Sequence, residues 1–133
     1  MQGIDTNVLV RMIVDDDPDQ CAAARAWASR LTPEAPGYVG LITSVEFIWV
    51  LQRTYGFART AIIDTLRQLL NVPEIIFEDA DDLNTALWRA EQSAADIVDA
   101  LIVVRNTRAG CSDTVSFDRR AALHAGMTVL NTD

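Results

Sequence analysis

Short apolar runs alternate along this chain with longer stretches in which apolar residues recur every three or four positions. The short runs predict strands and the longer stretches predict amphipathic helices. Expected strands cover residues 1–4, 38–42, 74–77, 114–117 and 127–130. Expected helices cover residues 7–14, 18–27, 44–55, 59–70, 81–93, 97–109 and 119–124, with a loop at 32–37.

This alternation of strands and helices predicts an α/β fold with a central, mostly parallel sheet flanked by helices. Parallel neighbours need a crossover connection, which a helix usually supplies. The chain has 133 residues, half of them apolar, which suits one domain over residues 1–133 with a core of its own. In such sheets, ligands gather outside the carboxyl ends of the strands.

The sequence has no apolar run of about 20 residues and no basic segment leading into an apolar one near its start, so we expect a cytoplasmic protein. Cys21 and Cys111 lack the spacing of a metal site. Two reduced thiols are therefore expected rather than a disulfide or a zinc site.

Acidic residues outnumber basic ones by 19 to 11, which gives a net charge of -8. This balance argues against a broad electrostatic surface for nucleic acid, so an RNA substrate would have to be held locally. All eleven basic residues are arginines, which bind phosphate in a bidentate manner. Arginine-only usage is also compatible with a simple bias of genome composition.

Five acidic side chains stand near strand ends or helix starts: Asp5, Glu46, Asp96, Asp99 and Asp118. If the fold brings them together, like charges raise one another's pKa and destabilise the fold unless a cation is present. Oxygen ligands suit Mg²⁺ or Mn²⁺, which can stabilise the attacking and leaving oxygens of a phosphodiester.

Each of these acids also has a purely structural interpretation. Asp5, Asp96 and Asp118 stand where helix N-caps are expected, and residues 43–46 have the form of a capping box in which Glu46 reaches back to the cap. Asp99 lies one turn into its helix, where the helix dipole favours a negative charge. Considered singly, each acid fits a cap or a first-turn position.

Four motifs carry a family resemblance: Asp5-Thr6-Asn7-Val8-Leu9, Thr43-Ser44-Val45-Glu46, residues 95–102 (ADIVDALI) and Ser116-Phe117-Asp118-Arg119. In this order, and over nearly the whole chain, they resemble the PIN-domain ribonucleases and, more narrowly, the VapC-type toxins of toxin–antitoxin pairs.

The resemblance implies a role for each residue. Asp5, Glu46 and Asp99 match the core acidic triad, Asp118 matches a frequent fourth catalytic acid, and Asp96 matches a further metal ligand. Three supporting residues match as well: Asn7, which helps to orient the first Asp, Thr6 beside it, and Ser116, which replaces the threonine of many relatives. The implied activity is endoribonuclease cleavage that depends on Mg²⁺ or Mn²⁺.

The resemblance also implies partners: an RNA substrate (tRNA, rRNA or mRNA), a cognate antitoxin protein and a second copy in a homodimer. The apolar run 47–51 is expected to be mostly core, and with Tyr55, Phe57, Ile62 and Ile63 it also offers an interface. Scattered arginines such as Arg11, Arg53, Arg105 and Arg119 would set the choice of RNA.

Two other functions are weighed against this one. A phosphatase of the haloacid-dehalogenase type would need a second Asp where this chain has Asn7. A catalytically inactive PIN-like module that binds RNA or protein would be marked by the loss of one or more acids. All of the acids are present, which favours the nuclease.

Overall fold

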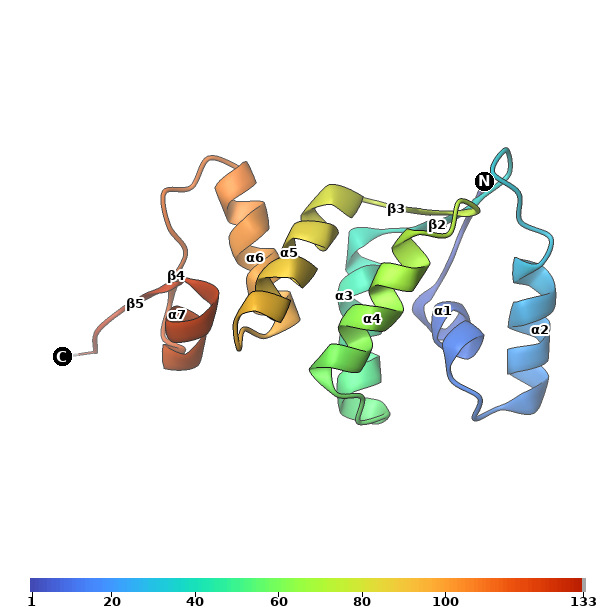
Figure 1. Ribbon diagram of the computed structural model, residues 1–133, viewed down its shortest axis with the longest axis horizontal. Helices are drawn as coiled ribbons and strands as arrows, with labels where there is room; N and C mark the ends of the chain where they lie inside the picture. Colours follow the sequence, from blue (N-terminus) through green and yellow to red (C-terminus); the bar gives the residue numbers. More distant parts are fainter. Residues whose placement is uncertain (133) are drawn as a thin grey trace. The chain divides into compact units, whose positions relative to one another are not determined.

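The computed structural model describes residues 1–132. The chain forms two compact units, residues 1–80 and the remainder from Asp81 on, and each is described by itself. In Figure 1 the first unit runs from blue to yellow-green and the second from yellow to red. The expectation of one domain over residues 1–133 stays a prediction.

The first unit is built around a parallel sheet with strand order β1-β2-β3. Gly3 is paired with Tyr38, which is paired in turn with Ile76. Its elements are β1 (Gln2–Gly3), α1 (Thr6–Ile13), α2 (Pro18–Ala28), β2 (Gly37–Val39), α3 (Leu41–Trp49), the π-helical turn η1 (Val50–Thr54), α4 (Arg59–Leu70) and β3 (Ile75–Phe77). Helix α1 packs against α2 and α3, as Figure 1 shows.

The predicted core of the first unit is confirmed for most of its apolar residues. Phe47, Ile48 and Leu51 are buried on α3 and η1, as are Ile62 and Ile63 on α4. These five side chains are therefore core residues, which removes them from the expected interface. Burial of several large aliphatic and aromatic side chains is the main favourable term in folding such a unit.

The start of α3 differs from the prediction. The strand expected at 38–42 ends at Val39, and the helix begins at Leu41 with Gly40 as its N-cap. The prediction of a capping box at residues 43–46 is therefore wrong. The backbone N–H of Leu41 donates instead to Glu78 Oε1 over 2.7 Å. Glu78, which lies far along the sequence, therefore accepts the hydrogen bond at the helix start that the local pattern predicted for Glu46.

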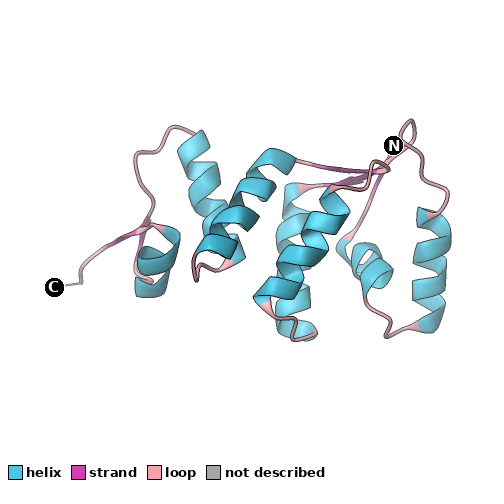
Figure 2. Ribbon diagram, viewed as in Figure 1, coloured by secondary structure: helices cyan, strands magenta, loops and turns pink. Residues whose placement is uncertain are grey.

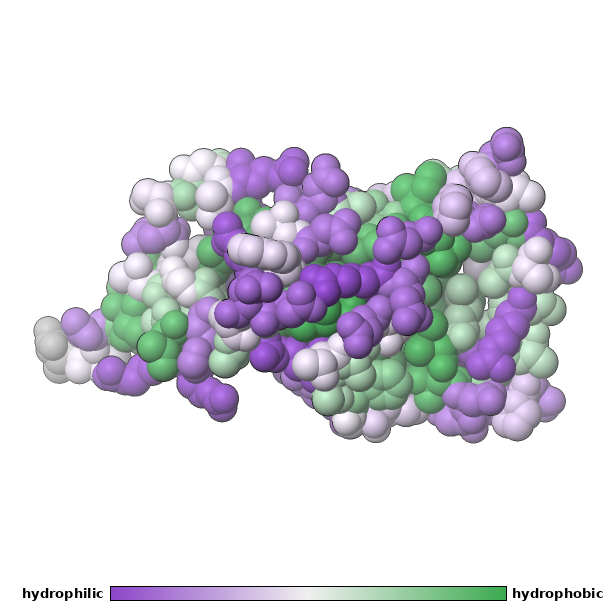
Figure 3. All heavy atoms as spheres, viewed as in Figure 1, coloured by the Kyte–Doolittle hydropathy of each residue, from purple (hydrophilic) through white to green (hydrophobic). Residues whose placement is uncertain are grey.

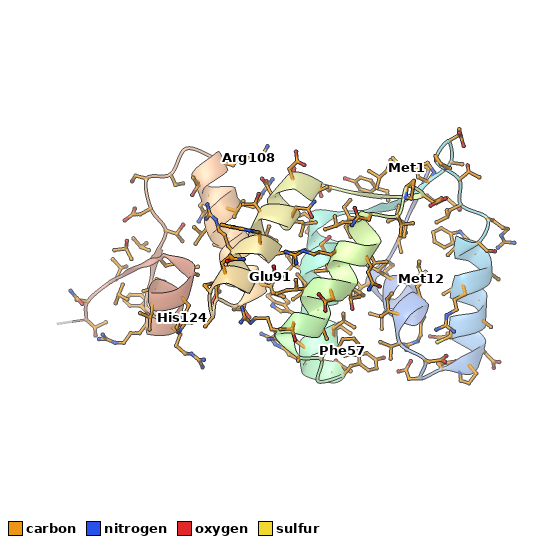
Figure 4. All side chains as sticks on the ribbon, in the orientation of Figure 1. Met1, Met12, Phe57, Glu91, Arg108 and His124 are labelled. Atoms are coloured by element: carbon orange, nitrogen blue, oxygen red, sulfur yellow. The ribbon has the colours of Figure 1, made fainter. Side chains whose placement is uncertain are left out.

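The second unit consists of helices and a small parallel sheet. Its elements are α5 (Ala80–Gln92), α6 (Ile97–Arg108), β4 (Val115–Ser116), α7 (Arg119–Ala125) and β5 (Thr128–Val129). Ser116 is paired with Val129 in that sheet. Helix α7, which carries His124 in Figure 4, ends at Gly126 with a φ of 80°, a left-handed conformation that favours glycine.

A buried acid joins two helices of the second unit. Asp82 on α5 accepts from Arg105 Nη1 over 3.1 Å and from Arg108 Nε over 2.9 Å, both on α6. The side chain of Asp82 is only 5% exposed, so its charge depends on these two partners.

Every strand pairing named above is parallel, which confirms the predicted α/β class with its mostly parallel strands. Figure 2 shows how the helices (cyan) flank the short strands (magenta) in each unit. Over residues 1–132, no helix has both the length and the apolar character needed to cross a membrane. Both thiols were expected to be partly buried, but Cys21 is buried and Cys111 is exposed.

Candidate functional site

Asp5 stands between β1 and α1, where the chain leaves the sheet. It is the N-cap of α1, and its Oδ1 accepts a hydrogen bond of 2.9 Å from the backbone N–H of Thr6. Asp5 and Asn7 are exposed, whereas Thr6 between them is buried. The turn therefore presents two polar side chains to solvent at the carboxyl end of a strand, where ligands of parallel sheets gather.

A cavity of about 260 Å³ brings Asp5 and Glu46 together although they lie far apart in the sequence. Glu46 comes from the middle of α3, which packs against α1. We call this space the acid-lined cavity, and it is lined by Asp5, Thr6, Asn7, Val10, Arg11, Glu46, Val50 and Tyr55. The first unit thus holds two of the predicted acids and two of the predicted supporting residues around one space.

Two buried hydroxyl groups lie beside these acids in sequence. Within residues 1–132, Thr6 Oγ1 and Ser44 Oγ have no hydrogen-bond partner. A buried hydroxyl without a partner costs free energy, which gives each of these two groups a reason to bind an ion or a water molecule. Thr6 follows Asp5 as the first residue of α1, and Ser44 lies two residues before Glu46 on α3.

The other three acids gather in the second unit. Asp96 is the N-cap of α6 and accepts from the backbone N–H of Asp99 over 3.0 Å. Burial raises the pKa of Asp99 above its usual range, and the negative charges of Asp96 and Asp118 raise it further. The carboxylate of Asp99 therefore lies close enough to Asp96 and Asp118 for their charges to affect its ionisation.

Asp118 is held at its place by a short turn. Ser116 Oγ accepts from the backbone N–H of Asp118 over 2.9 Å. Asp118 Oδ1 accepts in turn from the backbone N–H groups of Arg120 and Ala121, over 2.8 and 3.2 Å, and caps α7. The supporting residue Ser116 thus fixes the backbone of the acid that follows it.

The capping interpretation is confirmed for three of the acids. Asp5, Asp96 and Asp118 each cap a helix through Oδ1. A carboxylate has two oxygens and about four acceptor sites, so a cap through Oδ1 does not occupy Oδ2. Capping and metal binding are therefore compatible at the same residue. Among residues 1–132, the N-caps of the helices that carry Glu46 and Asp99 are other residues, Gly40 and Asp96.

The donor set fits a divalent cation by its chemistry. The side chains concerned are carboxylates and hydroxyls, which are the hard oxygen ligands that Mg²⁺ and Mn²⁺ take. Burial raises the pKa of Asp99 most and the charges of Asp96 and Asp118 raise it further, and a bound cation would offset both effects. Within residues 1–132, no three side chains of the His, Cys, Asp and Glu types come close enough to one another to hold a metal ion.

Sequence reasoning missed the wall of the acid-lined cavity formed by Arg11 and Tyr55. Arg11 Nη1 donates to Tyr55 Oη over 2.9 Å, and Tyr55 Oη donates to Asp16 Oδ2 over 2.6 Å. From the sequence, Arg11 was predicted only as one of several scattered arginines, and Tyr55 only as part of an apolar interface. No local pattern links them, because the contact joins α1 to the end of η1.

Comparison with known proteins identifies the family. The sequence model of the PIN domain matches residues 4–126, which is most of the chain. The chain therefore belongs to the PIN-domain family, and the resemblance drawn from its four motifs is confirmed at that level.

Among solved structures, the chain is similar to the crystal structure of Mycobacterium tuberculosis VapC20, described as a toxin that cleaves the sarcin–ricin loop. The match has 21% sequence identity and a TM-score of 0.43, and it covers 96% of this chain and 97% of that one. A search of curated proteins found no match.

Proposed function

We propose that this PIN-domain protein is an endoribonuclease that depends on Mg²⁺ or Mn²⁺ and acts as the toxin of a toxin–antitoxin pair. The observation that carries the proposal is the acid-lined cavity, where Asp5 and Glu46 meet. The cluster of Asp96, Asp99 and Asp118 in the second unit supports it. The four motifs that resemble the PIN ribonucleases carry all of the acids that the resemblance implies.

Asp5 and Asp99 are the principal metal ligands in this proposal. Glu46, Asp96 and Asp118 would bind the metal directly or through water, and one of the carboxylates would accept the proton of the attacking water. When bound, a divalent ion lowers the pKa of a bound water toward neutrality and so supplies hydroxide near pH 7.

The chain's other residues hold these acids in place. Ser116 orients the backbone before Asp118, and the cap formed by Asp96 fixes the backbone of Asp99. Thr6 and Asn7 border the cavity beside Asp5. Attack by water with the 3′-oxygen as leaving group leaves a 5′-phosphate and a 3′-hydroxyl on the products.

Partners follow from the same proposal. An antitoxin protein would block the acids, most effectively with an arginine that pairs with carboxylates. A second copy of the chain would form a homodimer. Figure 3 shows hydrophobic atoms (green) among hydrophilic ones (purple) on its visible face, and Ile42 and Trp49 on α3 are exposed. These exposed side chains offer contact area to either partner.

An inactive PIN-like module that binds RNA or protein is the alternative. It would not need charged carboxylates clustered around Asp99, because that clustering costs stability without a cation.

The test is cleavage of pooled cellular RNA by the purified protein. We expect cleavage with Mg²⁺ or Mn²⁺ and none after EDTA, and loss of cleavage in Asp5→Asn, Glu46→Gln and Asp99→Asn. Glu34→Gln, in an exposed loop of the first unit, is the matched control and should cleave as the parent does. Cleavage that persists in EDTA, or in all three variants, contradicts the proposal.

A further inference from the structure

Arg11 is the sole cation among the eight residues described as lining the acid-lined cavity. It stands in the last turn of α1, whose first residue follows Asp5. One short helix therefore carries an acid of the candidate site at its start and an arginine of the same cavity near its end. A proposed nuclease with a net charge of -8 needs a local cation of this kind to hold a polyanion.

Three side chains hold the guanidinium of Arg11 in one orientation. Its Nε donates to Gln20 Oε1 over 2.9 Å, and its Nη1 donates to Tyr55 Oη over 2.9 Å. Asp16 Oδ1 lies 3.4 Å from the same Nη1. The side chain is 22% exposed, so it is packed along its length and still reaches solvent. Such a guanidinium loses little further entropy when it binds a ligand.

Tyr55, the partner of Arg11, stands at the end of the π-helical turn that follows α3. The backbone N–H of Tyr55 donates to the carbonyl of Val50 over 3.3 Å, a bond that spans five residues. Single π-helical turns inside helices frequently accompany functional sites.

A structural role alone would be to fasten α1 to α2 and η1. The ion pair with Asp16 and the hydrogen bonds to Gln20 and Tyr55 suffice for that. Within residues 1–132, however, the hydrogen bonds of Arg11 use Nε and Nη1 and leave the Nη2 group unused. An oriented guanidinium with one nitrogen available, in a cavity shared with two carboxylates, is arranged for an anionic ligand.

We propose that Arg11 binds a backbone phosphate of the RNA beside the phosphate that is cleaved, and that Tyr55 is a positioning residue for Arg11. This inference rests on the proposed function and names a residue that its acidic cluster does not include. Phosphate binding by Arg11 draws the RNA along α1 toward Asp5 and Glu46. Because the contact is to the backbone, it contributes affinity without sequence preference.

The experiment measures binding of fluorescein-labelled polyuridylate by fluorescence anisotropy, over a range of salt concentrations with Mg²⁺ present. Asp99→Asn serves as the background, so that cleavage does not interfere. We expect Arg11→Ala in that background to weaken binding about tenfold and to lower the slope of log Kd against log salt by about 0.7, the value for one phosphate of a single strand.

Arg25→Ala is the matched control, because Arg25 on α2 pairs with Asp15 of the same acidic turn but lines no part of the acid-lined cavity. It should leave both affinity and slope near the values of the background protein. Tyr55→Phe should raise KM for cleavage of pooled RNA in the active protein while leaving the salt slope unchanged, because it removes the orienting hydroxyl but no charge.

Arg11→Lys keeps the test decisive if Arg11→Ala does not fold. It preserves the charge and the salt slope but loses the fixed fork, so its KM should rise as that of Tyr55→Phe does. If the parent cleaves RNA and Arg11→Ala matches Arg25→Ala in affinity and slope, the inference is overturned and the proposed function stands. A parent that neither binds nor cleaves RNA overturns both.

Discussion

Asp96 Oδ1 accepts a 3.0 Å hydrogen bond from the backbone N–H of Asp99, three residues further along α6. The two acids thus have different local roles although they lie one turn apart. Asp96 satisfies an N–H group at the helix start, and Asp99 satisfies none of its helix's free N–H groups. Because of this difference, separate mutations of Asp96 and Asp99 can distinguish the stability lost with a helix cap from the stability gained by removing charge repulsion.

Asp99→Asn is expected to raise or preserve the melting temperature of the metal-free protein. The change removes one charge from a cluster in which burial and the charges of Asp96 and Asp118 already disfavour ionisation. A thermal melt in EDTA measures the effect. If Asp99 were only a first-turn acid, the variant would be less stable by about 0.3 to 1 kcal/mol.

Asp96→Ala is the contrasting variant. It removes the cap of α6 as well as a charge, so we expect a loss of stability of about 1 kcal/mol, offset in part by reduced repulsion of Asp99. Guanidinium-chloride unfolding measures the free energy. A variant as stable as Asp99→Asn would show that the cap contributes little here.

The stability of the metal-free protein should also fall as pH rises through the titration of Asp99. The folded protein holds the pKa of Asp99 above the value of about 3.9 expected for an unfolded chain, so between these two values the unfolded state binds fewer protons. Unfolding curves of the parent against pH, with Asp99→Asn as the reference, isolate this contribution. An identical pH dependence in the two proteins would contradict it.

Mg²⁺ or Mn²⁺ is expected to raise the melting temperature of the parent more than that of Asp99→Asn. A ligand that binds only the folded protein stabilises it by mass action, and the variant replaces one oxygen of a proposed metal ligand with an amide nitrogen and removes its negative charge. Parallel melts across a metal titration measure both shifts. Equal shifts would place the bound metal away from Asp99.

Tyr55 should ionise at a higher pH than an unperturbed tyrosine. Its hydrogen bond to Asp16 is the largest cause of a raised pKa, because ionisation would break that bond and set two negative charges side by side. The associated stability is present below about pH 10 and is lost as pH rises through the raised pKa. The difference between the ultraviolet absorbance titrations of the parent and Tyr55→Phe reports it.

Asp82→Asn should destabilise the protein by about 1 to 3 kcal/mol. It leaves Arg105 and Arg108 facing a buried amide in place of a carboxylate. Figure 4 labels Arg108 near the end of α6. Asp81→Asn, one residue earlier and exposed, is the control for removing an acid from the first turn of α5. In chemical unfolding, the free energy of unfolding of Asp82→Asn should be lower than that of Asp81→Asn by most of this predicted loss.

Local sequence pattern was sufficient to predict most of the elements and the residue types of the candidate site. Apolar periodicity placed α4, α5 and α6 within a few residues, because burial of one helix face requires that spacing. Asp5, Asp96 and Asp118 were predictable as caps, because a cap depends on a few neighbouring backbone groups. The order of four acidic motifs was sufficient to indicate the family that the match over residues 4–126 confirms.

Tertiary structure alone decided the features that depend on contacts between distant segments. Glu78 accepts a hydrogen bond from the first N–H of α3, a contact that no pattern near residue 41 reveals. The helix begins at Leu41, before the predicted start at residue 44. The π-helical turn places Tyr55 against Arg11, and the packing of α1 on α3 puts Asp5 and Glu46 around one cavity. Local sequence encodes backbone preference and burial, whereas the meeting of polar side chains from separate helices is set by how those helices pack.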